Sequence, residues 1–220
     1  MIALKIAAIL IFGYLLGSIP FGVIAARMRS GVDVTKYGSG KIGVTNVLRT
    51  AGKRAAAMAM IGDLGKGALG VFLAGMFWGD AVVQIGQFQL DWQVAQVMAA
   101  LAMMAGHNWS AFLKLHGGRG VAVFFGSWFA MSPLTALFGG EMLLLVVIIY
   151  RYMSLGSIVG AIAIWSLIAV LTVFNGFPPI YLLYGLIATL LIFYQHRDNI
   201  SRLLAGTERR IGEKAEQLRA

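Results

Sequence analysis

Residues 37–50 combine glycines with side chains that donate hydrogen bonds. Glycine lets backbone N–H groups approach an anion closely, and polar side chains at the start of a helix near Val44 would add donors, so the stretch suits a phosphate group. Its candidate ligands are Gly38, Gly40, Gly43, Thr45, Asn46 and Arg49. The Lys-Ser/Thr pair of a nucleotide-binding P-loop is missing after the second glycine. A flexible loop between helices is the alternative interpretation.

Residues 106–120 form a second glycine-rich stretch that carries positive charge. The residues concerned are Lys114, Gly117, Gly118, Arg119 and Gly120. Two stretches suited to phosphate predict either two anions or one anion with two charged ends. The alternative is that the two basic residues serve only to orient a membrane protein.

Two further pairs of polar residues are spaced three apart, which places both members of a pair on one helix face. Ser154 and Ser157 form the first pair, and His196 and Asn199 form the second. Hydroxyls in membrane helices usually bond back to their own backbone, and a single histidine at an interface is more often structural than catalytic. Each pair therefore keeps a structural and a functional interpretation.

Asp63 and Lys66 lie three residues apart within an apolar run. An unpaired charge at the bilayer centre costs ~2.5–3.5 kcal/mol on insertion scales. We therefore expect a structural salt bridge that braces the stretch 37–50. A proton relay would need a chain of further ionisable groups, and the other predicted spans supply no such chain.

These stretches belong to a chain of 220 residues that is 59% hydrophobic and 12% charged. At about 20 residues per span, this composition suffices for about six or seven membrane spans and excludes an ordinary soluble domain. The absence of cysteine excludes disulfides, a thiolate nucleophile and Cys-bound zinc. We attribute the net charge of +9 to basic loops at one membrane face and expect no nucleic-acid partner.

We predict an all-α polytopic membrane protein with one domain over residues 1–220. The seven predicted spans are 2–24, 55–78, 94–105, two short spans within 121–150, 155–174 and 180–194. The run 121–150 is divided because one straight helix at ~1.5 Å per residue would exceed the ~30 Å hydrocarbon core. Ser132-Pro133 and Gly139-Gly140-Glu141 interrupt this run. Five spans, with the remaining apolar stretches at the interface, is the alternative.

Gly13 and Gly17, four residues apart in the first span, predict close packing against another helix. Orientation follows from the basic residues, because 16 of the 18 Lys and Arg residues fall in segments that seven spans place on one side. The opposite loops, 79–91, 131–141 and 175–179, contain none. The positive-inside rule therefore puts the N-terminus outside and the C-terminus and the candidate site in the cytoplasm.

Five blocks, in order along the chain, resemble the bacterial acyl-phosphate:glycerol-3-phosphate acyltransferase family. They read Gly38-Ser-Gly-x-x-Gly-x-Thr-Asn46 with Arg49; Asp63-x-x-Lys-Gly67; Gly106-His107 with Phe-Leu-x-x-x-Gly-Gly-x-Gly-Val-Ala122; Arg151-Tyr-x-Ser-Leu-x-Ser-Ile158; and His196-Arg-x-Asn-Ile-x-Arg-Leu203 with Gly-Thr-Glu208. Each block is modestly specific alone, whereas five in order are a strong signal.

The resemblance implies a seven-helix enzyme of the bacterial cytoplasmic (inner) membrane. It would transfer a fatty acyl group from acyl phosphate to glycerol 3-phosphate, giving lysophosphatidic acid and inorganic phosphate, the first acylation of phospholipid biosynthesis. It would need neither a metal nor a cofactor, and a peripheral enzyme could supply the acyl phosphate. The catalytic residues implied are Ser39, Arg49, His196 and Asn199.

Within that set, the resemblance implies that Ser39, Arg49 and His196 hold glycerol 3-phosphate. The residues implied for the donor phosphate are Thr45, Asn46, Ser154, Ser157 and Asn199. Glu208 matches a carboxylate expected to organise the site. An acyl phosphate is already activated, so the protein mainly aligns the hydroxyl with the carbonyl and stabilises the leaving phosphate. The proton acceptor is either that phosphate, as in the family, or His196 as a general base.

The chain departs from the family pattern at three places, which lie in two of these blocks. Lys41 and Val44 stand where the family usually has Asn and Ala, Ser110 replaces Pro, and His116 and Arg119 replace two lysines. The lysine matched by His116 is a phosphate contact in the family. We expect either Lys114 to reach the phosphate instead, or His116 to be protonated on binding.

A transporter of a phosphorylated or anionic small molecule is the alternative function from another class. Transporters of this kind are typically built from inverted repeats with paired interrupted helices, and their sites lie near the bilayer midplane. The sequence shows no such repeat, and its polar groups gather at one face. We therefore favour the enzyme.

Overall fold

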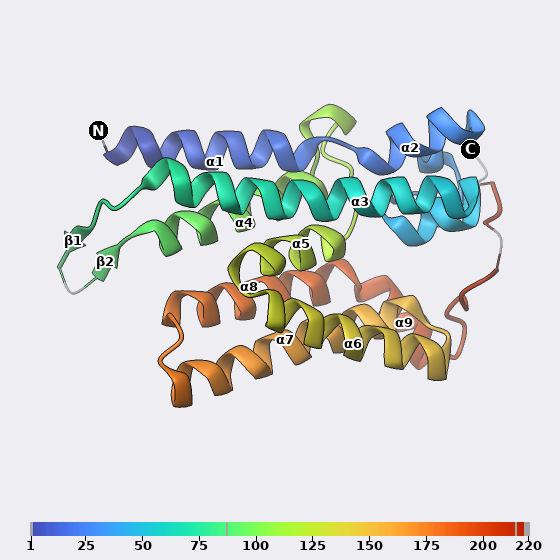
Figure 1. Ribbon diagram of the computed structural model, residues 1–220. Coiled ribbons are helices and arrows are strands. Elements are labelled where there is room, and N and C mark those ends of the chain that lie inside the picture. Colours follow the sequence, from blue (N-terminus) through green and yellow to red (C-terminus); the bar gives the residue numbers. More distant parts are fainter. Residues whose placement is uncertain (1, 87, 214, 218–220) are drawn as a thin grey trace.

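The computed structural model describes residues 2–86, 88–213 and 215–217, and these residues are mostly helical. Figure 1 shows the long helices side by side in layers, with α1, α3 and α4 on one side, α6 and α7 on the other, and α5 and α8 between them. Their bounds are α1 (Ile2–Ser18), α3 (Val44–Trp78), α4 (Trp92–Asn108), α5 (Val121–Met131), α6 (Pro133–Tyr150), α7 (Met153–Asn175) and α8 (Pro179–Gln195).

The predicted span 2–24 is broken at Pro20 into two helices. α1 ends at Ser18, and α2 (Phe21–Ser30) begins directly after the proline. Proline has no N–H and cannot continue the helical hydrogen-bond pattern. The carbonyl of Ile19 accepts a 3.1 Å hydrogen bond from the N–H of Phe21 and a 2.8 Å hydrogen bond from Lys66 Nζ. The predicted span therefore lies within a broken helical segment, residues 2–30, that is long and apolar enough to cross a membrane.

α3 begins at Val44, 11 residues before the predicted start of the second span. This confirms the helix start that the phosphate-binding interpretation of residues 37–50 required. Gly52 interrupts α3 with φ +82° and ψ −179°, a backbone conformation that residues with side chains avoid. The first turns of α3 are thus set at an angle fixed by Gly52.

The predicted division of residues 121–150 is confirmed at Ser132 and wrong at Gly139-Gly140-Glu141. α5 ends at Met131 and α6 begins at Pro133, where a proline fits because the first helical N–H needs no partner. α6 then continues through both glycines. Gly139 packs against the carbonyl of Gly160 and the side chain of Ile164, leaving no room for a side chain. The predicted loop 131–141 is therefore a one-residue turn.

Residues 79–91 were predicted as a loop between helices. They contain a short antiparallel hairpin of β1 (Val83–Ile85) and β2 (Phe88–Leu90), a strand element that the all-α prediction missed. The carboxylate of Asp91 then caps α4 by accepting hydrogen bonds from the N–H groups of Gln93 and Val94.

Within the part of the chain that the structure describes, four helical segments are long and apolar enough to cross a membrane, namely residues 2–30, 44–78, 133–150 and 153–175. A fifth arises if α8 is joined with α9 (Arg197–Leu204), which bends away by 62°. α5 is apolar but only 11 residues long. A multi-pass helical membrane protein is therefore confirmed, whereas the count of seven spans stays a prediction.

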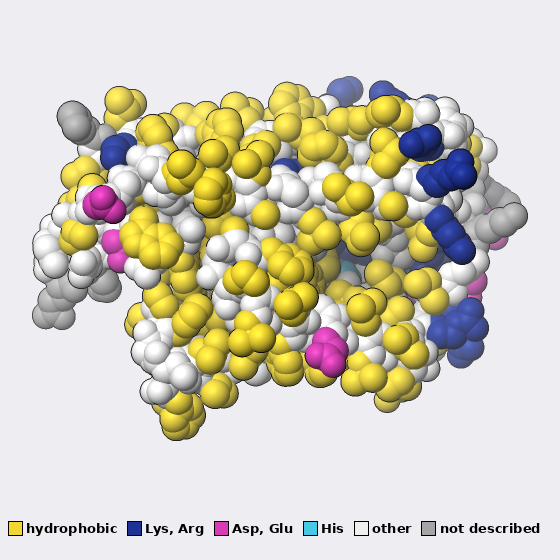
Figure 2. Space-filling view, viewed as in Figure 1, with side chains coloured by type: hydrophobic (Ala, Val, Ile, Leu, Met, Phe, Trp, Pro, Cys, Tyr) yellow, Lys and Arg dark blue, Asp and Glu magenta, His cyan; other side chains and the backbone are white. Residues whose placement is uncertain are grey.

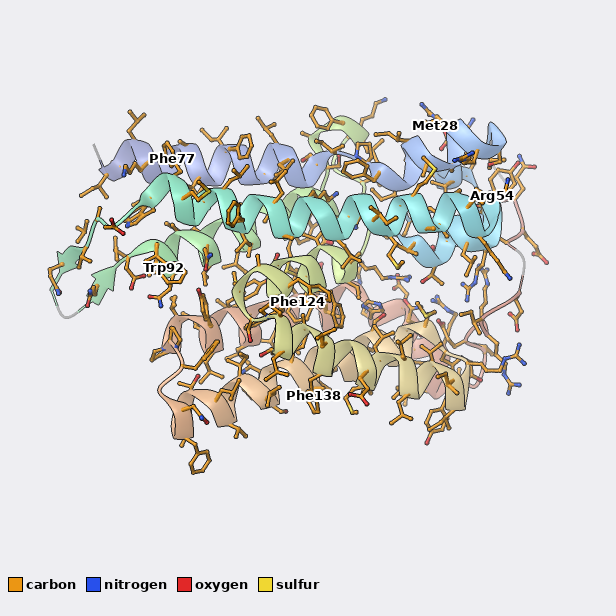
Figure 3. The ribbon with its side chains drawn as sticks, in the orientation of Figure 1. Met28, Arg54, Phe77, Trp92, Phe124 and Phe138 are labelled. Carbon is orange, nitrogen blue, oxygen red and sulfur yellow. The ribbon has the colours of Figure 1, made fainter. Side chains whose placement is uncertain are left out.

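Close contacts hold the layers together. Gly17 packs against the backbone of Met103 and Gly13 against that of Ala99, which confirms the predicted close helix packing and places it between α1 and α4. Between α5 and α8, the buried rings of Trp128 and Tyr184 lie 5.3 Å apart between centroids. In Figure 3, Phe124 lies between the layers, whereas Phe77, Phe138 and Met28 point outward.

Candidate functional site

Two cavities adjoin between the segment 38–49, the start of α5 and the end of α8. The polar cavity, of about 120 Å³, is lined by Gly38, Ser39, Lys41, Arg49, Arg119, Asp198, Asn199, Arg202, Glu208 and Arg209. The apolar groove, of about 830 Å³, also contains Ser39, Lys41, Arg49 and Arg119 in its wall. A cationic junction therefore connects a small polar space to a large apolar one.

The wall of the apolar groove comes mainly from α3, α5 and α6. Its large apolar residues include Met60, Leu64, Phe125, Phe129, Leu137, Leu144 and Ile148. Thr45, Ser157 and His196 add polar groups to the same wall. This combination of a long apolar surface with a few polar groups suits a lipid-like ligand with a polar head.

Residues 37–43 are shaped by Asn46. Its Nδ2 lies 2.8–3.1 Å from the carbonyl oxygens of Val34, Tyr37 and Lys41. Its Oδ1 accepts a 3.3 Å hydrogen bond from the N–H of Ser39, and it occupies the space that a Cβ on Gly38 would need. Gly38 and Gly40 both have positive φ. The predicted phosphate ligand Asn46 is thus engaged in holding Ser39 at the junction.

The guanidinium group of Arg49 spans both cavities and the C-terminal segment. Its Nη2 donates hydrogen bonds to the carbonyls of Arg209 (3.0 Å) and Arg210 (3.3 Å). Its Nε is buried and has no partner within the described residues. One N–H of Arg49 therefore stays available for an anion at the junction.

Arg119 is the second cation at the junction, and its buried Nε also lacks a partner in the described part of the chain. Burial lowers the pKa of Arg119 to about 10, while the negative charge of Glu208 opposes the shift. The side chain therefore remains positively charged at neutral pH. Two buried, unpartnered guanidinium Nε atoms are the feature expected of an anion site.

Glu208 gathers three donors from two segments. Its Oε1 accepts hydrogen bonds from Ser154 Oγ (2.8 Å) and Asn199 Nδ2 (2.7 Å), and its Oε2 accepts one from Arg202 Nε (2.8 Å). Burial raises the pKa of Glu208, but these three bonds outweigh it, so its pKa lies below the ordinary value. Glu208 is therefore a carboxylate at neutral pH.

The two serines of the predicted pair behave differently. Ser154 bonds to Glu208, whereas Ser157 Oγ donates to the carbonyl of Met153 at 2.7 Å, in its own helix. Ser157 thus follows the structural interpretation of its hydroxyl, although its side chain lines the apolar groove.

His196 follows the last residue of α8 and is buried. Its Nδ1 lies 2.8 Å from the carbonyl oxygen of Ile192, which requires a hydrogen on Nδ1 and leaves Nε2 as an acceptor. Burial and the charge of Arg119 lower the pKa of His196 to about 4. The imidazole is therefore neutral at pH 7 and can accept a hydrogen bond from a hydroxyl.

Of the stretch 106–120, His107, Arg119 and Gly120 reach the cavities, and His107 lines the apolar groove. Arg119 lines both, and Gly120 lines the apolar groove. Lys114 and His116 are exposed and line neither cavity. His116 Nδ1 instead lies 2.9 Å from the Lys114 carbonyl. The structure does not bring these two predicted phosphate ligands to the site.

Gly117 and Gly118 also differ from their predicted role as backbone donors to an anion. The N–H of Gly118 donates to the carbonyl of His107 at 2.9 Å. A Cβ on Gly118 would collide with the His107 ring, and one on Gly117 with the His107 carbonyl. Both glycines therefore serve packing against α4.

Asp63 and Lys66 form the predicted salt bridge. Lys66 Nζ lies 2.8 Å from Asp63 Oδ1, and both side chains are buried. His107 Nδ1 lies 3.1 Å from Lys66 Nζ, so the cluster also contacts α4. The pair braces the break at Ile19, and not the stretch 37–50 as predicted.

Comparison with known proteins identifies the family. The family model described as glycerol-3-phosphate acyltransferase matches residues 7–206. The chain belongs to this family. Glycerol-3-phosphate acyltransferase 3 of Dehalococcoides mccartyi (strain CBDB1) is 46% identical over 215 residues, covering 98% of this chain and 100% of the relative. The glycerol-3-phosphate acyltransferase of Clostridioides difficile (strain 630) is 42% identical, covering 94% and 96%.

A solved structure has the same fold. The crystal structure of PlsY, an integral membrane glycerol 3-phosphate acyltransferase, in its glycerol 3-phosphate form, matches with a TM-score of 0.81 at 35% identity. The match covers 94% of this chain and 96% of that one. The lysophosphatidic acid form of PlsY matches with a TM-score of 0.79.

Three basic residues of the polar cavity of this family member were not predicted as site residues, namely Lys41, Arg202 and Arg209. Arg202 follows Asn199 by three positions in α9, so the helix spacing that paired His196 with Asn199 could also have indicated it. Lys41 attracted notice only as a departure from the family pattern, yet it lines both cavities. A lysine between two glycines of a loop suited to phosphate could have been predicted as a site residue from the sequence alone.

Proposed function

We propose that this acyltransferase transfers a fatty acyl group from acyl phosphate to the sn-1 hydroxyl of glycerol 3-phosphate, releasing lysophosphatidic acid and inorganic phosphate. The junction of the polar cavity with the apolar groove carries the proposal. A water-soluble phosphate ester and an acyl chain can react only where a polar and an apolar space meet. Here they meet at Ser39, Lys41, Arg49 and Arg119.

The polar cavity accepts glycerol 3-phosphate in this proposal. Arg49 and Arg119 pair with its phosphate through the N–H groups that lack partners, and Ser39 adds a hydroxyl. The neutral His196 accepts a hydrogen bond from a glycerol hydroxyl through Nε2. Asn199 Nδ2 donates a hydrogen bond to Glu208, and Asn199 Oδ1 has no partner among the described residues. Because its available atom is an acceptor, Asn199 suits a substrate hydroxyl better than the donor phosphate.

The apolar groove accepts the acyl chain of the donor. Thr45 and Ser157 lie in its wall, with Arg119 supplying positive charge at the junction. Thr45 contacts the donor phosphate, and Ser157 does so once its hydroxyl turns from the carbonyl of Met153 to the phosphate. Ser154, Asn46 and Glu208 act as positioning residues, because their polar atoms are engaged with neighbouring protein groups.

The reaction follows from this arrangement. The glycerol hydroxyl oxygen forms the new ester bond to the acyl carbonyl carbon, and the bond from that carbon to the phosphate oxygen breaks. The hydroxyl proton passes to the leaving phosphate, directly or through Nε2 of His196. The positive charge of Arg119 at the junction stabilises the charge on the leaving phosphate, and the two cavities align the reactants.

We further propose seven spans in the bacterial cytoplasmic membrane, with the N-terminus outside and the C-terminus inside. Seven helical segments support this arrangement: α1 with α2, and each of α3 to α8. Figure 2 shows Lys and Arg gathered at the end of the molecule that holds α2 and α9, as the positive-inside rule requires of a cytoplasmic face. A peripheral enzyme would then supply acyl phosphate at this face.

The test is turnover by the purified protein in detergent with palmitoyl phosphate and glycerol 3-phosphate. We expect inorganic phosphate and lysophosphatidic acid in equal amounts without a sealed vesicle. Product from palmitoyl-CoA but not from palmitoyl phosphate would reject the proposed donor. A requirement for two compartments would instead indicate transport.

A further inference from the structure

Glu141 lies in the middle of α6, among residues suited to the bilayer interior. It is exposed, it lines the apolar groove, and none of the salt bridges among the described residues involves it. Figure 2 shows an acidic side chain surrounded by hydrophobic ones over α6, and Glu141 is the one acidic residue of this helix. An ionisable side chain in such surroundings needs a functional explanation.

The position of Glu141 on the helix directs it along the groove. Leu137, Leu144 and Ile148 lie four, three and seven residues from it, which places all four on one face of α6, and all four line the groove. The aromatic ring of Phe125 faces this space from α5. A chain lying along the groove therefore meets apolar side chains with one carboxyl group among them.

The depth of Glu141 follows from the contact between α6 and α7. Gly160 of α7 packs against Gly139 and Leu143 of α6. Glu141 lies midway between these two residues of α6, so Gly160 and Glu141 lie at about the same depth in the helix layer. Ser157, which also lines the groove, lies three residues earlier in α7, about 4.5 Å away along the axis. Glu141 is thus about one helical turn deeper than Ser157.

We propose that Glu141 is a specificity-determining residue that accepts a hydrogen bond from a hydroxyl close to the carboxyl end of the acyl chain. This inference rests on the proposed function, in which the donor phosphate lies at Ser157 and the first few carbons of the chain reach Glu141. A hydroxyl on one of these carbons satisfies the carboxyl group, whereas methylene groups leave it without a partner.

The test compares palmitoyl phosphate with 3-hydroxypalmitoyl phosphate in the purified protein in detergent. The measured quantity is the ratio of kcat/KM for the hydroxylated donor to that for the plain donor. We expect E141L to lower this ratio about tenfold, because a hydrogen bond to a charged group is lost. E141Q keeps an acceptor oxygen and should retain most of the ratio.

Two controls test whether the preference depends on where the hydroxyl and the carboxyl group lie, or only on their being polar. The same ratio measured with 16-hydroxypalmitoyl phosphate should not change in E141L, because that hydroxyl lies at the far end of the chain. The double variant E141L/L137E moves the carboxyl group by one turn away from Ser157, and it should not restore the preference for the 3-hydroxy chain.

An equal ratio in the parent protein and in E141L would overturn the role of Glu141. Thermal unfolding in detergent reports that each variant is folded. Absence of product from palmitoyl phosphate in the parent protein would count against the proposed function instead, so the two failures are distinguishable.

Discussion

Ser154 Oγ donates a 2.8 Å hydrogen bond to Glu208 Oε1, which ties the first turn of α7 to the segment that follows α9. Asn199 and Arg202 donate to the same carboxylate from α9. A carboxylate with three protein donors fixes one wall of the polar cavity and does not need a substrate as partner. Its removal should act on the site through the residues that it holds.

E208Q should lower kcat/KM for glycerol 3-phosphate at least tenfold. The amide replaces one acceptor oxygen with a donor that faces Arg202 or Asn199, and the charge-assisted bonds are lost. S154A is the matched control, because it removes one donor and leaves the carboxylate with Asn199 and Arg202. We expect about a threefold loss in S154A. Equal losses in the two variants would contradict the organising role of Glu208.

His196 should make stability depend on pH. The pKa of the folded protein's His196 is about 4, because of burial and the charge of Arg119, whereas an unperturbed histidine has a pKa near 6.5. Between these values the unfolded chain binds a proton that the folded chain excludes, so stability falls as the pH drops below 6.5. The expected loss is about 2 kcal/mol between pH 7 and pH 5.

Thermal unfolding in detergent measures this dependence. H196Q should flatten the decline of the unfolding temperature between pH 7 and pH 5, whereas H116Q, at an exposed histidine, should keep the parent slope. The depressed pKa of Glu208 acts in a lower window, because its stabilisation is complete above its ordinary pKa and is lost at more acidic pH. An unchanged slope in H196Q would show that His196 is not held neutral.

The buried pair of Asp63 and Lys66 should be important for stability. K66M leaves the carboxylate of Asp63 without its 2.8 Å partner and removes one of the two hydrogen bonds to the carbonyl of Ile19. Breaking one partner of a buried pair costs about 3–5 kcal/mol. The unfolding temperature of K66M should fall below that of D63N/K66M, in which no charge remains unpaired. The opposite order would mean that the pair does not brace the break.

The sequence predicts the helix break at Ser132-Pro133 correctly and the one at Gly139-Gly140 incorrectly, for a physical reason. Glycine tolerates a break but does not require one, so its effect depends on its tertiary neighbours. Gly139 is needed because α7 approaches it closely, whereas Gly52 has nothing within 4 Å and uses its freedom to interrupt α3. The local sequence shows neither the close approach of α7 to Gly139 nor the open space around Gly52.

The same limit explains the second glycine-rich stretch. The order of the blocks predicts that residues 38–49, Arg119 and residues 196–208 meet, and they do line adjoining cavities. It does not predict which basic side chains of the stretch point inward. Lys114 and Leu115 both adopt positive φ, and this turn leaves His116 at the surface. The conformation of this turn depends on the packing of Gly117 and Gly118 against His107.

Arg119 and His116 should therefore differ in importance for binding. R119Q removes a buried charge from the junction of the two cavities and should lower kcat/KM on the order of hundredfold. R119K keeps a charge and should lose less. H116Q should change the KM for glycerol 3-phosphate less than twofold at pH 6 and at pH 8. A large, pH-dependent change of KM in H116Q would mean that His116 takes part in binding the phosphate.

Gly52 sets the direction of the first turns of α3, which contain Thr45, Asn46 and Arg49. Its φ of +82° with ψ of −179° is a conformation for glycine, and another residue held there is strained by about 1–3 kcal/mol. G52A should therefore either destabilise the protein or straighten the helix and move Arg49 away from the junction. In both cases kcat/KM for glycerol 3-phosphate should fall, by about tenfold if Arg49 moves.

G65A is the matched control for this prediction, since Gly65 lies in the same helix, has no neighbour within 4 Å and has ordinary helical φ. Alanine there gains about 1 kcal/mol of helix propensity, so neither the unfolding temperature nor the KM should worsen. Both variants add one methyl group to α3, so the comparison isolates the backbone conformation. If G52A behaved like G65A, the interruption at Gly52 would not position the site, and the placement of Arg49 would depend instead on its bonds to the carbonyls of Arg209 and Arg210.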